Sequence, residues 1–258
     1  MIIFGTDFDD TLYFHHQGGV REEDAKAIRR FQAAGNQFGL VTGRARTMRG
    51  LLEDMSEHKV DFDFWIFSNG AQVCDRSSRI LYQRFLDPAF VREAVEDMPD
   101  VGFIFHGENE LIRTPKKNYP DFPTRIVRSA SEFDPSRILA ISFSHITPEG
   151  AQLLKETQKR DDVIAVANSR FADFNPVGVT KGTALKALAA QIGKPGDFTA
   201  AIGDSFNDLS MLEEADVSFT FPDSPKEVQE AATYIVSGIA EAVDILLRLQ
   251  NNPHAESR

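Results

Sequence analysis

The first 70 residues alternate between short apolar runs and longer segments in which apolar residues recur every three or four positions. Residues 2–6 form an apolar run that ends in acidic residues, as a buried parallel strand does. Residues 21–34 are charged on one side and apolar on the other, which predicts a helix. The same patterns predict strands at residues 37–41 and 64–67 and a helix at residues 46–57. Strand–helix–strand alternation implies a parallel sheet with right-handed crossovers.

The middle of the chain has shorter strands and more turns. Residues 71–82 predict a hairpin that turns at Arg76-Ser77-Ser78. Helices are predicted to open at Asp87-Pro88 and at Thr147-Pro148, where a threonine N-cap and a proline in the first turn suit a helix start. The predicted strands are residues 102–106, 138–144, 163–167 and 171–174. Helices interleaved with paired short strands predict a compact α+β insertion.

Regular α/β alternation resumes at Thr180. It predicts helices at residues 181–191, 206–215 and 238–250 and strands at residues 198–202 and 216–219. We therefore expect an α/β fold with a Rossmann-like parallel sheet. Its core domain would consist of residues 1–82 and 176–258, and an inserted α+β cap would occupy residues 83–175.

The composition narrows the possible partners. The 258 residues include 28 Lys and Arg against 39 Asp and Glu, which gives a formal net charge of −11. This acidic balance argues against polyanionic partners, so we expect neither nucleic acid nor a membrane surface to be bound. Hydrophobic residues at 42% and charged residues at 26% are typical of a folded globular chain.

Several further features favour a cytoplasmic protein. Cys74 is the single cysteine, which excludes an internal disulfide and a cysteine-based zinc site and fits a reducing compartment. No apolar run approaches the roughly 20 residues of a membrane span. The first residues lack the basic region and the long apolar stretch of a signal peptide. We expect a monomer or a small homo-oligomer.

An acidic cluster follows the first predicted strand, Asp7-Phe8-Asp9-Asp10-Thr11. Its carboxylates repel one another unless a cation or a proton neutralises them. Carboxylate oxygens at this position are suited to Mg²⁺. The alternative is a solvated turn or a helix cap.

Two short motifs are candidates for binding an anion. Thr42-Gly43-Arg44 ends the second predicted strand and offers a hydroxyl and accessible backbone amides. Lys181 begins a predicted helix, where the helix dipole disfavours a positive charge. An ordinary turn and a surface lysine are the structural alternatives.

A second acidic cluster follows the strand predicted at residues 198–202. Its sequence is Gly203-Asp204-Ser205-Phe206-Asn207-Asp208. Asp204 can be a metal ligand and Asp208 can orient the groups around the metal. Helix capping is the alternative, for which Asp204 or Ser205 would serve.

Together these motifs resemble the haloacid dehalogenase-like hydrolase superfamily. Asp7-x-Asp9-x-Thr11, Thr42, Lys181 and Gly203-Asp204-x-x-x-Asp208 occur in that family's order. The insertion between the Thr42 and Lys181 motifs resembles the Cof-type branch, which has a large α/β cap of the C2 type. Two further segments are similar to that branch, Ser68-Asn69-Gly70-Ala71 and Asn175-Pro176-x-Gly178-x-x-Lys181-Gly182. Asp10 departs from the glycine of that branch, which adds a charge and puts the local turn geometry in question.

The resemblance implies a Mg²⁺-dependent phosphatase of small phosphorylated metabolites, with sugar phosphates as the first expectation. Asp7 would be the nucleophile that forms an aspartyl-phosphate. Asp9 would protonate the leaving group and then activate water, and its backbone carbonyl would bind the metal. Asp7 and Asp204 would also be metal ligands, and Asp208 would support the metal site.

The remaining site residues would act on the phosphate or the substrate. Thr42 and the amide of Gly43 would hold the phosphoryl oxygens, and Lys181 would balance their charge. Asn207 is a candidate for positioning Lys181 or the phosphate. Arg44 and Asn69 flank the site and are candidate substrate contacts.

Two other functions stay open on the sequence alone. A sugar phosphomutase would carry the same motifs, and a catalytically inactive protein could bind phosphorylated metabolites as a regulator. Asp7 together with Asp9 favours an enzyme, because a non-enzyme has no reason to keep both. Two motifs are interpreted as solvated surface groups, Asp61-Phe62-Asp63 and His15-His16.

Overall fold

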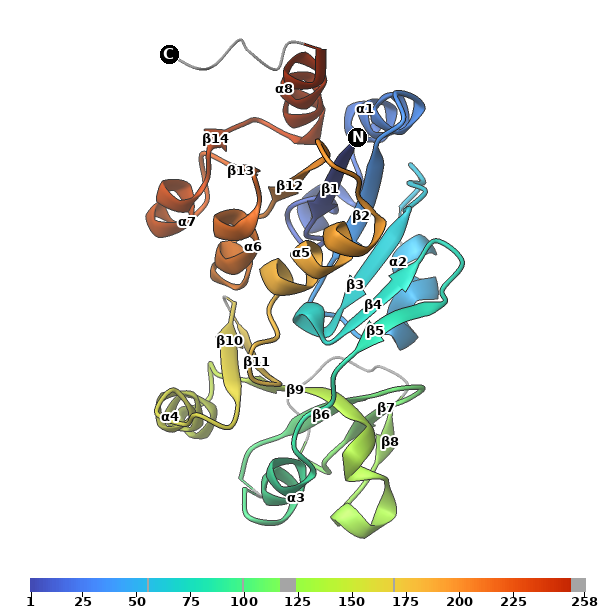
Figure 1. The fold of residues 1–258 in the computed structure, drawn as a ribbon. Coiled ribbons are helices and arrows are strands. Elements are labelled where there is room, and N and C mark those ends of the chain that lie inside the picture. Colours follow the sequence, from blue (N-terminus) through green and yellow to red (C-terminus); the bar gives the residue numbers. More distant parts are fainter. Residues whose placement is uncertain (55, 99, 117–123, 169, 252–258) are drawn as a thin grey trace.

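The computed structural model describes residues 1–54, 56–98, 100–116, 124–168 and 170–251, and the fold consists of two sheets with their helices (Figure 1). The larger sheet has eight strands in the order β14-β13-β12-β1-β2-β3-β4-β5. The smaller sheet has six strands in the order β10-β11-β9-β6-β7-β8. The α/β fold class with a parallel-sheet core and an inserted α+β part is confirmed.

The larger sheet is parallel from β14 to β3 and ends in the antiparallel strands β4 and β5. Its strands are β1 Ile2–Thr6, β2 Gln37–Val41, β3 Phe64–Phe67, β4 Gln72–Asp75, β5 Ile80–Gln83, β12 Phe198–Ile202, β13 Val217–Thr220 and β14 Tyr234–Ile235. Both ends of the chain therefore contribute strands to one sheet, as the interrupted pattern of the sequence predicts.

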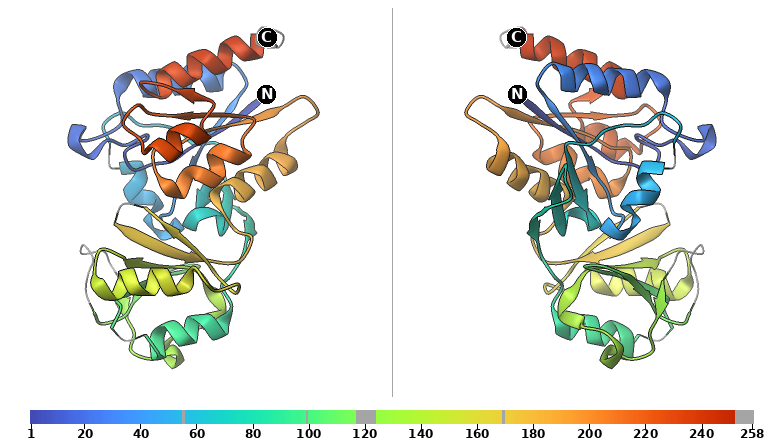
Figure 2. Two further views of the ribbon diagram at one scale, coloured as in Figure 1. Left: turned by 90° about the vertical axis from the view of Figure 1, so that its left-hand side faces the viewer. Right: turned by 90° about the vertical axis from the view of Figure 1, so that its right-hand side faces the viewer.

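Helices cover both faces of this sheet (Figures 1 and 2). On one face lie α1 Glu22–Ala33, α2 Arg49–Asp54 and α8 Ile239–Asn251, and on the other lie α5 Lys181–Ile192, α6 Leu209–Glu214 and α7 Lys226–Ala231. Neighbouring residues of β1 point to opposite faces, so Phe4 packs with α1 and α8, while Ile3 packs with α5 and α6. Burial on both faces explains why this strand is apolar throughout.

Among the described residues, the helices of the smaller sheet lie on one face, the face turned away from the larger sheet (Figure 2). Its elements are α3 Pro88–Glu96, β6 Phe103–Gly107, β7 Leu111–Arg113, β8 Arg125–Ile126, β9 Ile138–Ser144, α4 Pro148–Thr157, β10 Ile164–Ala167 and β11 Phe171–Asn175. Phe103 and Phe105 pack with the helices in one hydrophobic cluster. The residues that alternate with them, Ile104 and His106, therefore face the larger sheet. The domain boundaries at residues 83 and 175 stay a prediction.

The predicted elements differ from the structure where the hydrophobic pattern is weak. Of residues 46–57, predicted as one helix, the described ones include a 3₁₀ turn, Arg46–Met48, and the short helix α2. The predicted helix over residues 206–215 likewise begins as a 3₁₀ turn, Phe206–Asp208. The short elements β7, β8, α7 and β14 were not predicted, because two to six residues carry little periodicity. Further 3₁₀ turns span His15–Gln17, Ser68–Gly70, Ala130–Glu132 and Pro135–Arg137. Of the helices in the described ranges, none is long and apolar enough to cross a membrane.

Replacing Phe4 with alanine tests the aromatic centre of the larger sheet. The Phe4 ring is fully buried, with ring centroids 5.7 Å from Phe31, 5.3 Å from Phe38 and 6.0 Å from Phe219. Because truncation leaves a cavity, Phe4→Ala should lower the free energy of unfolding by about 3–5 kcal/mol in urea titrations. Ile235→Ala, at a side chain that is 50% exposed, is the control and should change it by less than about 0.5 kcal/mol. Equal effects of the two substitutions would contradict this account.

Candidate active site

The carboxyl ends of three neighbouring parallel strands form the floor of the site. β12, β1 and β2 lie side by side, and they are followed directly by Gly203, Asp7 and Thr42. Open α/β sheets place their ligands at this edge. The motifs that begin at Asp7, Thr42 and Gly203 therefore meet although they lie far apart in the chain.

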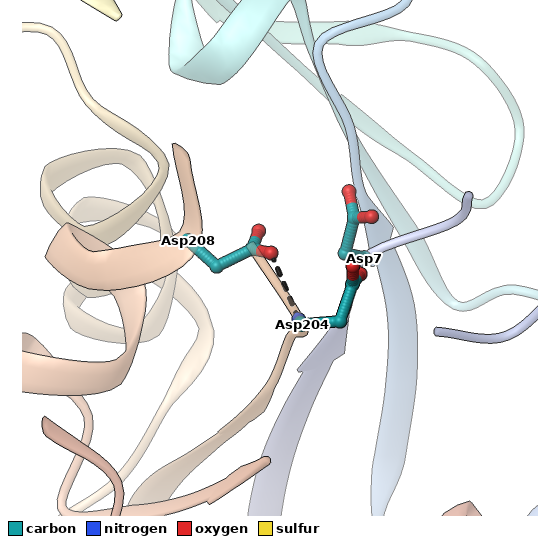
Figure 3. A group of neighbouring side chains, drawn as sticks. All are labelled: Asp7, Asp204 and Asp208. Carbon is teal, nitrogen blue, oxygen red and sulfur yellow. Dashed lines mark hydrogen bonds between the residues drawn. The ribbon is translucent and has the colours of Figure 1, made fainter. Parts of the chain in front are cut away.

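Three carboxylates converge above these strand ends (Figure 3). Asp7, Asp204 and Asp208 each offer an oxygen, and these oxygens lie within 4.8 Å of one another. Burial, followed by the charge of Asp208, raises the pKa of Asp204 to about 7. Burial also raises the pKa of Asp7 well above its usual value, against the lowering effect of Lys181. Buried carboxylates that repel one another are suited to a hard divalent cation such as Mg²⁺.

Lys181 supplies the positive charge of the site. It is the first residue of α5 and is almost fully buried. Its Nζ lies 2.5 Å from Asp7 Oδ1 and 2.7 Å from Asp208 Oδ1. Burial alone would lower the pKa of Lys181, but the charges of Asp208 and Asp7 raise it above its ordinary value. The side chain therefore stays an ammonium group, and the alternative of a surface lysine is wrong.

The loop after β12 is built around the Asp208 carboxylate. Asp208 Oδ2 accepts hydrogen bonds from the backbone N–H groups of Asp204 and Ser205, both at 3.1 Å (Figure 3 draws the first). A Cβ on Gly203 would lie 2.4 Å from Asp208 Cγ, so only glycine leaves room for this turn. Asp208 thus has both oxygens engaged within the protein, which makes it a positioning residue for the loop that carries Asp204.

Thr11, the last residue of the first motif, orients a carboxylate from the other half of the chain. Its Oγ1 donates a 2.6 Å hydrogen bond to Asp204 Oδ1, and its side chain is fully buried. The sequence motif included Thr11 without a role. Its contact joins the two acidic clusters, which are 193 residues apart.

Asp9 is held by two cationic or hydrogen-bonding side chains. Arg44 Nε and Nη2 donate to its two oxygens at 2.9 and 2.6 Å, and His15 Nε2 lies 2.8 Å from Oδ1. Burial alone would raise the pKa of Asp9, but the hydrogen bonds and charge of Arg44, with those of His15, lower it. His15, interpreted from the sequence as one of a solvated pair, therefore lies at the site. Its exposed position in a glycine-rich loop gave no sign of this contact.

Asp10 has a left-handed backbone conformation. Its φ is +58°, in the left-handed region that aspartate tolerates better than most residues. Its backbone N–H donates to the carbonyl of Tyr13 at 2.8 Å, which closes the turn. An aspartate in place of the expected glycine is thus accommodated in this turn.

A cleft of about 490 Å³ opens above these groups, between the larger sheet and the cap. Of the predicted residues it is lined by Asp7, Asp9, Thr42, Gly43, Arg44, Asp204 and Asn207. The side-chain oxygen of Asn207 is buried and has no hydrogen-bond partner among the described residues. Lys181 and Asp208 are buried and are not part of the lining. A volume of this size suits a small-molecule ligand.

Asn69 lies behind Gly43 and is not part of the cleft lining. Its Nδ2 donates to Asp173 Oδ2 at 2.8 Å and to Asn175 Oδ1 at 3.3 Å. A Cβ on Gly43 would approach Asn69 Oδ1 to 3.1 Å, so a larger residue would press on this contact. In this structure Asn69 holds a cap carboxylate in place, and a direct substrate contact stays a prediction.

A buried chain of hydrogen bonds crosses from the core domain to the cap, and the sequence analysis missed it. His106 Nδ1 lies 2.9 Å from Ser68 Oγ, and His106 Nε2 lies 2.9 Å from Ser142 Oγ, which donates in turn to Asp173. Burial lowers the pKa of His106 to about 4 and raises that of Asp173. The alternation of Phe103 and Phe105 with His106 was the available signal, since it places His106 on the opposite face of its strand.

Comparisons with known proteins agree with this architecture. A family model described as haloacid dehalogenase-like hydrolase matches residues 4–242. The Bacillus subtilis 5-amino-6-(5-phospho-D-ribitylamino)uracil phosphatase YcsE is 24% identical over 250 residues, which cover 93% of this chain and 94% of that protein.

Solved structures share the fold over nearly the whole chain. A haloacid dehalogenase-like hydrolase from B. subtilis has a TM-score of 0.83 at 21% identity and covers 95% of this chain and 100% of its own. The HAD subclass IIB sugar phosphatase BT4131 has a TM-score of 0.77 at 20% identity, with 98% and 99% covered.

Lys181→Met tests the buried charge cluster. The substitution leaves Asp7 and Asp208 buried without a counter-charge, which should lower the free energy of unfolding by about 3–5 kcal/mol in urea titrations without metal. Lys186→Met on the same helix is the matched control. Its side chain is 70% exposed and its nearest carboxylate is 3.8 Å away, so a change below about 1 kcal/mol is expected. A neutral Lys181→Met would refute the proposed role of the ammonium group.

His106→Gln tests the buried neutral imidazole. Because the folded pKa of His106, about 4, lies below the unfolded value near 6.5, His106 stabilises the fold above pH 6.5, and this stabilisation is lost as pH falls towards 4. Between pH 7.5 and pH 5 the loss should be about 2 kcal/mol larger in the unaltered protein than in His106→Gln. Unfolding titrations of both proteins at both pH values give this difference in the loss of stability. The contributions of the carboxyl groups that both proteins share cancel in it. Identical pH dependence would contradict a neutral buried His106.

Proposed function

We propose that this chain, which belongs to the haloacid dehalogenase-like hydrolases, is a Mg²⁺-dependent phosphatase that hydrolyses small phosphorylated metabolites through an aspartyl-phosphate. One observation carries the proposal, the buried contact of Lys181 with Asp7 and Asp208 beside the Asp204 carboxylate. Sugar phosphates are the first substrate class to consider, and two of the similar proteins are named phosphatases of phosphorylated sugar-like compounds.

The acidic cluster fits the proposed Mg²⁺. Asp7 and Asp204 would hold the ion with carboxylate oxygens, the backbone carbonyl of Asp9 would add a third oxygen, and Asp208 would hold the loop in place. The raised pKa values of Asp7 and Asp204 support this assignment, because burial, their largest cause, and the neighbouring carboxylates both disfavour the negative charges that a divalent cation would stabilise. The bound ion would neutralise part of the phosphate charge and polarise its oxygens.

Asp7 is the proposed nucleophile. A phosphomonoester is a dianion and repels an anionic nucleophile, so its charge has to be balanced locally. The Lys181 ammonium group, 2.5 Å from Asp7 Oδ1, can do this for both the carboxylate and a bound phosphoryl group. Thr42 and Gly43 line the cleft, and the Thr42 hydroxyl and the Gly43 amide would hold the phosphoryl oxygens. Asp7 would then attack phosphorus, and the ester oxygen would leave opposite to it.

Asp9 is the proposed general acid and base. To activate water as a base, Asp9 has to be a carboxylate, and its contacts with Arg44 and His15 keep it one. As an acid it has to gain a proton, which those contacts oppose. Arg44 lines the cleft. If Arg44 instead donated its hydrogen bonds to a phosphoryl oxygen of the substrate, Asp9 would lose this contact and could be protonated. Binding of substrate would thus prepare the acid.

The proposal also covers the oligomeric state and the cellular location of the enzyme. All site side chains named here come from one chain, so a monomer would suffice, and a small homo-oligomer would not alter the site. Cys74 is a buried free thiol, which fits the reducing cytoplasm.

A phosphate-release assay tests the proposed function. Purified protein should release phosphate from members of a panel of phosphorylated sugars and cofactors with Mg²⁺ and not with a chelator. Asp7→Asn should lower the rate about 10³-fold or more, because the nucleophile is lost. Asp61→Asn, at the other D-x-D motif, is the matched control and should leave the rate unchanged, since that side chain is 84% exposed and is not part of the cleft lining.

Three outcomes would overturn the proposal. Equal activity with chelator would exclude the metal, and full activity in Asp7→Asn would exclude the nucleophile. Isomerisation of a sugar phosphate without free phosphate would favour the phosphomutase.

A further inference from the structure

The proposed general acid Asp9 has a neighbour that none of the sequence motifs contains. His15 Nε2 lies 2.8 Å from Asp9 Oδ1, and both residues line the cleft. A carboxylate can only accept a hydrogen bond, so His15 Nε2–H is the donor. Because the imidazole is 51% exposed, it contributes little to the packing of the core domain, and its role has to be sought in this contact.

A closed loop holds the backbone of His15 in place. At the base of the loop, Phe14 N–H donates to the carbonyl of Gly19 at 3.1 Å, and Gly19 N–H donates to the carbonyl of Phe14 at 3.3 Å. The guanidinium group of Arg21 lies over the Phe14 ring, 4.6 Å from its centroid, and the ring centroid of Phe221 is 6.4 Å away. These contacts anchor the residue directly before His15 to two other parts of the core domain.

The ring of Tyr13 supports the imidazole from the side. The ring centroids of Tyr13 and His15 are 5.0 Å apart in an edge-on arrangement, and the Tyr13 ring is stacked on Phe8 at 5.3 Å. The Tyr13 backbone belongs to the turn that contains Asp9. Its N–H donates to the carbonyl of Phe8, and its carbonyl accepts from the N–H of Asp10, each at 2.8 Å. One residue thus supports both the carboxylate and its imidazole donor.

The two oxygens of Asp9 have different donors. Arg44 Nε donates to Oδ2 at 2.9 Å, whereas Oδ1 accepts from both Arg44 Nη2, at 2.6 Å, and His15. In the proposed reaction, Arg44 donates to a phosphoryl oxygen of the substrate instead. Oδ2 then loses the one donor that it has among the described residues, and Oδ1 keeps His15. The oxygen that becomes available for a proton is therefore Oδ2.

A carboxyl group that has lost Arg44 needs a remaining partner to stay oriented. The torsion about the Cβ–Cγ bond of aspartate has a broad, twofold preference, so a carboxyl group without a fixed donor samples many orientations. General acid catalysis requires the proton to point at the leaving oxygen, and a misplacement of about 1 Å can cost about a hundredfold in rate. A single hydrogen bond to Oδ1 distinguishes the two oxygens and restricts this rotation.

We propose that His15 is a positioning residue for the general acid, which holds Asp9 Oδ1 and thereby directs Oδ2 at the ester oxygen of the substrate. The inference rests on the proposed phosphatase function. As Asp7 bonds to phosphorus, the bond between phosphorus and the ester oxygen breaks and leaves its electron pair on that oxygen. The oxygen takes the proton from Asp9 Oδ2, Asp9 becomes a carboxylate, and the alcohol leaves. His15 keeps its own proton throughout.

Two phosphate esters of similar shape test this role. 4-Nitrobenzyl phosphate releases an alkoxide, which needs the proton, whereas 4-nitrophenyl phosphate releases a phenolate that is stable enough to leave without one. The measured quantity is the ratio of kcat/KM for the benzyl ester over the phenyl ester, with Mg²⁺. His15→Ala should lower this ratio about tenfold, through kcat for the benzyl ester and with little change in KM. A ratio within one protein cancels a general loss of folded enzyme.

Three further proteins assign the effect. In His15→Gln the glutamine amide can donate to Asp9 Oδ1, so the ratio should return to within about threefold of the original. His16→Ala is the matched control and should leave the ratio unchanged, since His16 is exposed in the same loop and outside the cleft lining. Asp9→Asn should lower the ratio at least as far as His15→Ala. Adding His15→Ala to Asp9→Asn should lower it no further, because His15 acts through Asp9.

The possible failures are distinguishable. Equal losses for both esters in His15→Ala, or a ratio in His15→Gln as low as in His15→Ala, would overturn the positioning role and leave the phosphatase in place. An effect of His15→Ala that persists in full beside Asp9→Asn would overturn it as well. If the unaltered protein accepts only a phosphorylated sugar of the panel, kcat for that alkyl ester replaces the ratio, and a change in KM alone would overturn the role. No phosphate release from any phosphomonoester would overturn the phosphatase itself.

Discussion

The buried contact between one ammonium group and two carboxylates is the constraint on which the structure depends. Lys181, Asp7 and Asp208 come from three parts of the chain and are all buried. Removing such charges from water is costly, and the cost is tolerated only where partners are close and well oriented. The parallel sheet supplies that orientation, because β1 and β12 end side by side and α5 begins above them. A fold that positions these groups so strictly leaves them without freedom to relax their repulsion, which is why a divalent cation suits the site.

The cap depends on a second polar arrangement, at the boundary between the two sheets. Ser68 and Asn69 both have a φ of +51°, in a region that costs a residue other than glycine about 1–2 kcal/mol. Their side chains reach His106 and Asp173 of the cap, and Asn175 Nδ2 donates to the carbonyl of Ser68 at 2.7 Å. The hydrogen bonds between the two parts offset this local strain. The turn therefore has a strained backbone, and the hydrogen bonds of its side chains fix the position of the cap over the cleft.

The sequence predicted the parts of the molecule that rest on local patterns. β1, β2, β3, β9 and β12 have the predicted bounds, because both faces or one complete face of each is apolar. The motifs at strand ends were placed together correctly, since the carboxyl ends of parallel strands have to meet. The partners of each side chain were beyond local patterns. Contacts of Asp9 with Arg44 and His15, and of His106 with Ser68 and Ser142, join residues whose spacing in the chain carries no information about their distance in space.

The cleft lies between the two sheets, and we expect its cap side to determine which substrate binds. The proposed phosphoryl-binding side of the cleft would meet the same group in every phosphomonoester, so it would have little means of distinguishing one from another. The helices described for the cap sheet lie on one face, and the side chains of its strands alternate between that face and the cleft. Phe103, Phe105 and Phe143 form its hydrophobic core, whereas Ile104 and Ser142 face the cleft between them. Substitution on the cleft face would alter what binds there while the core of the cap stays packed. A two-sided sheet over a fixed reaction centre can therefore change its substrate without rebuilding its fold.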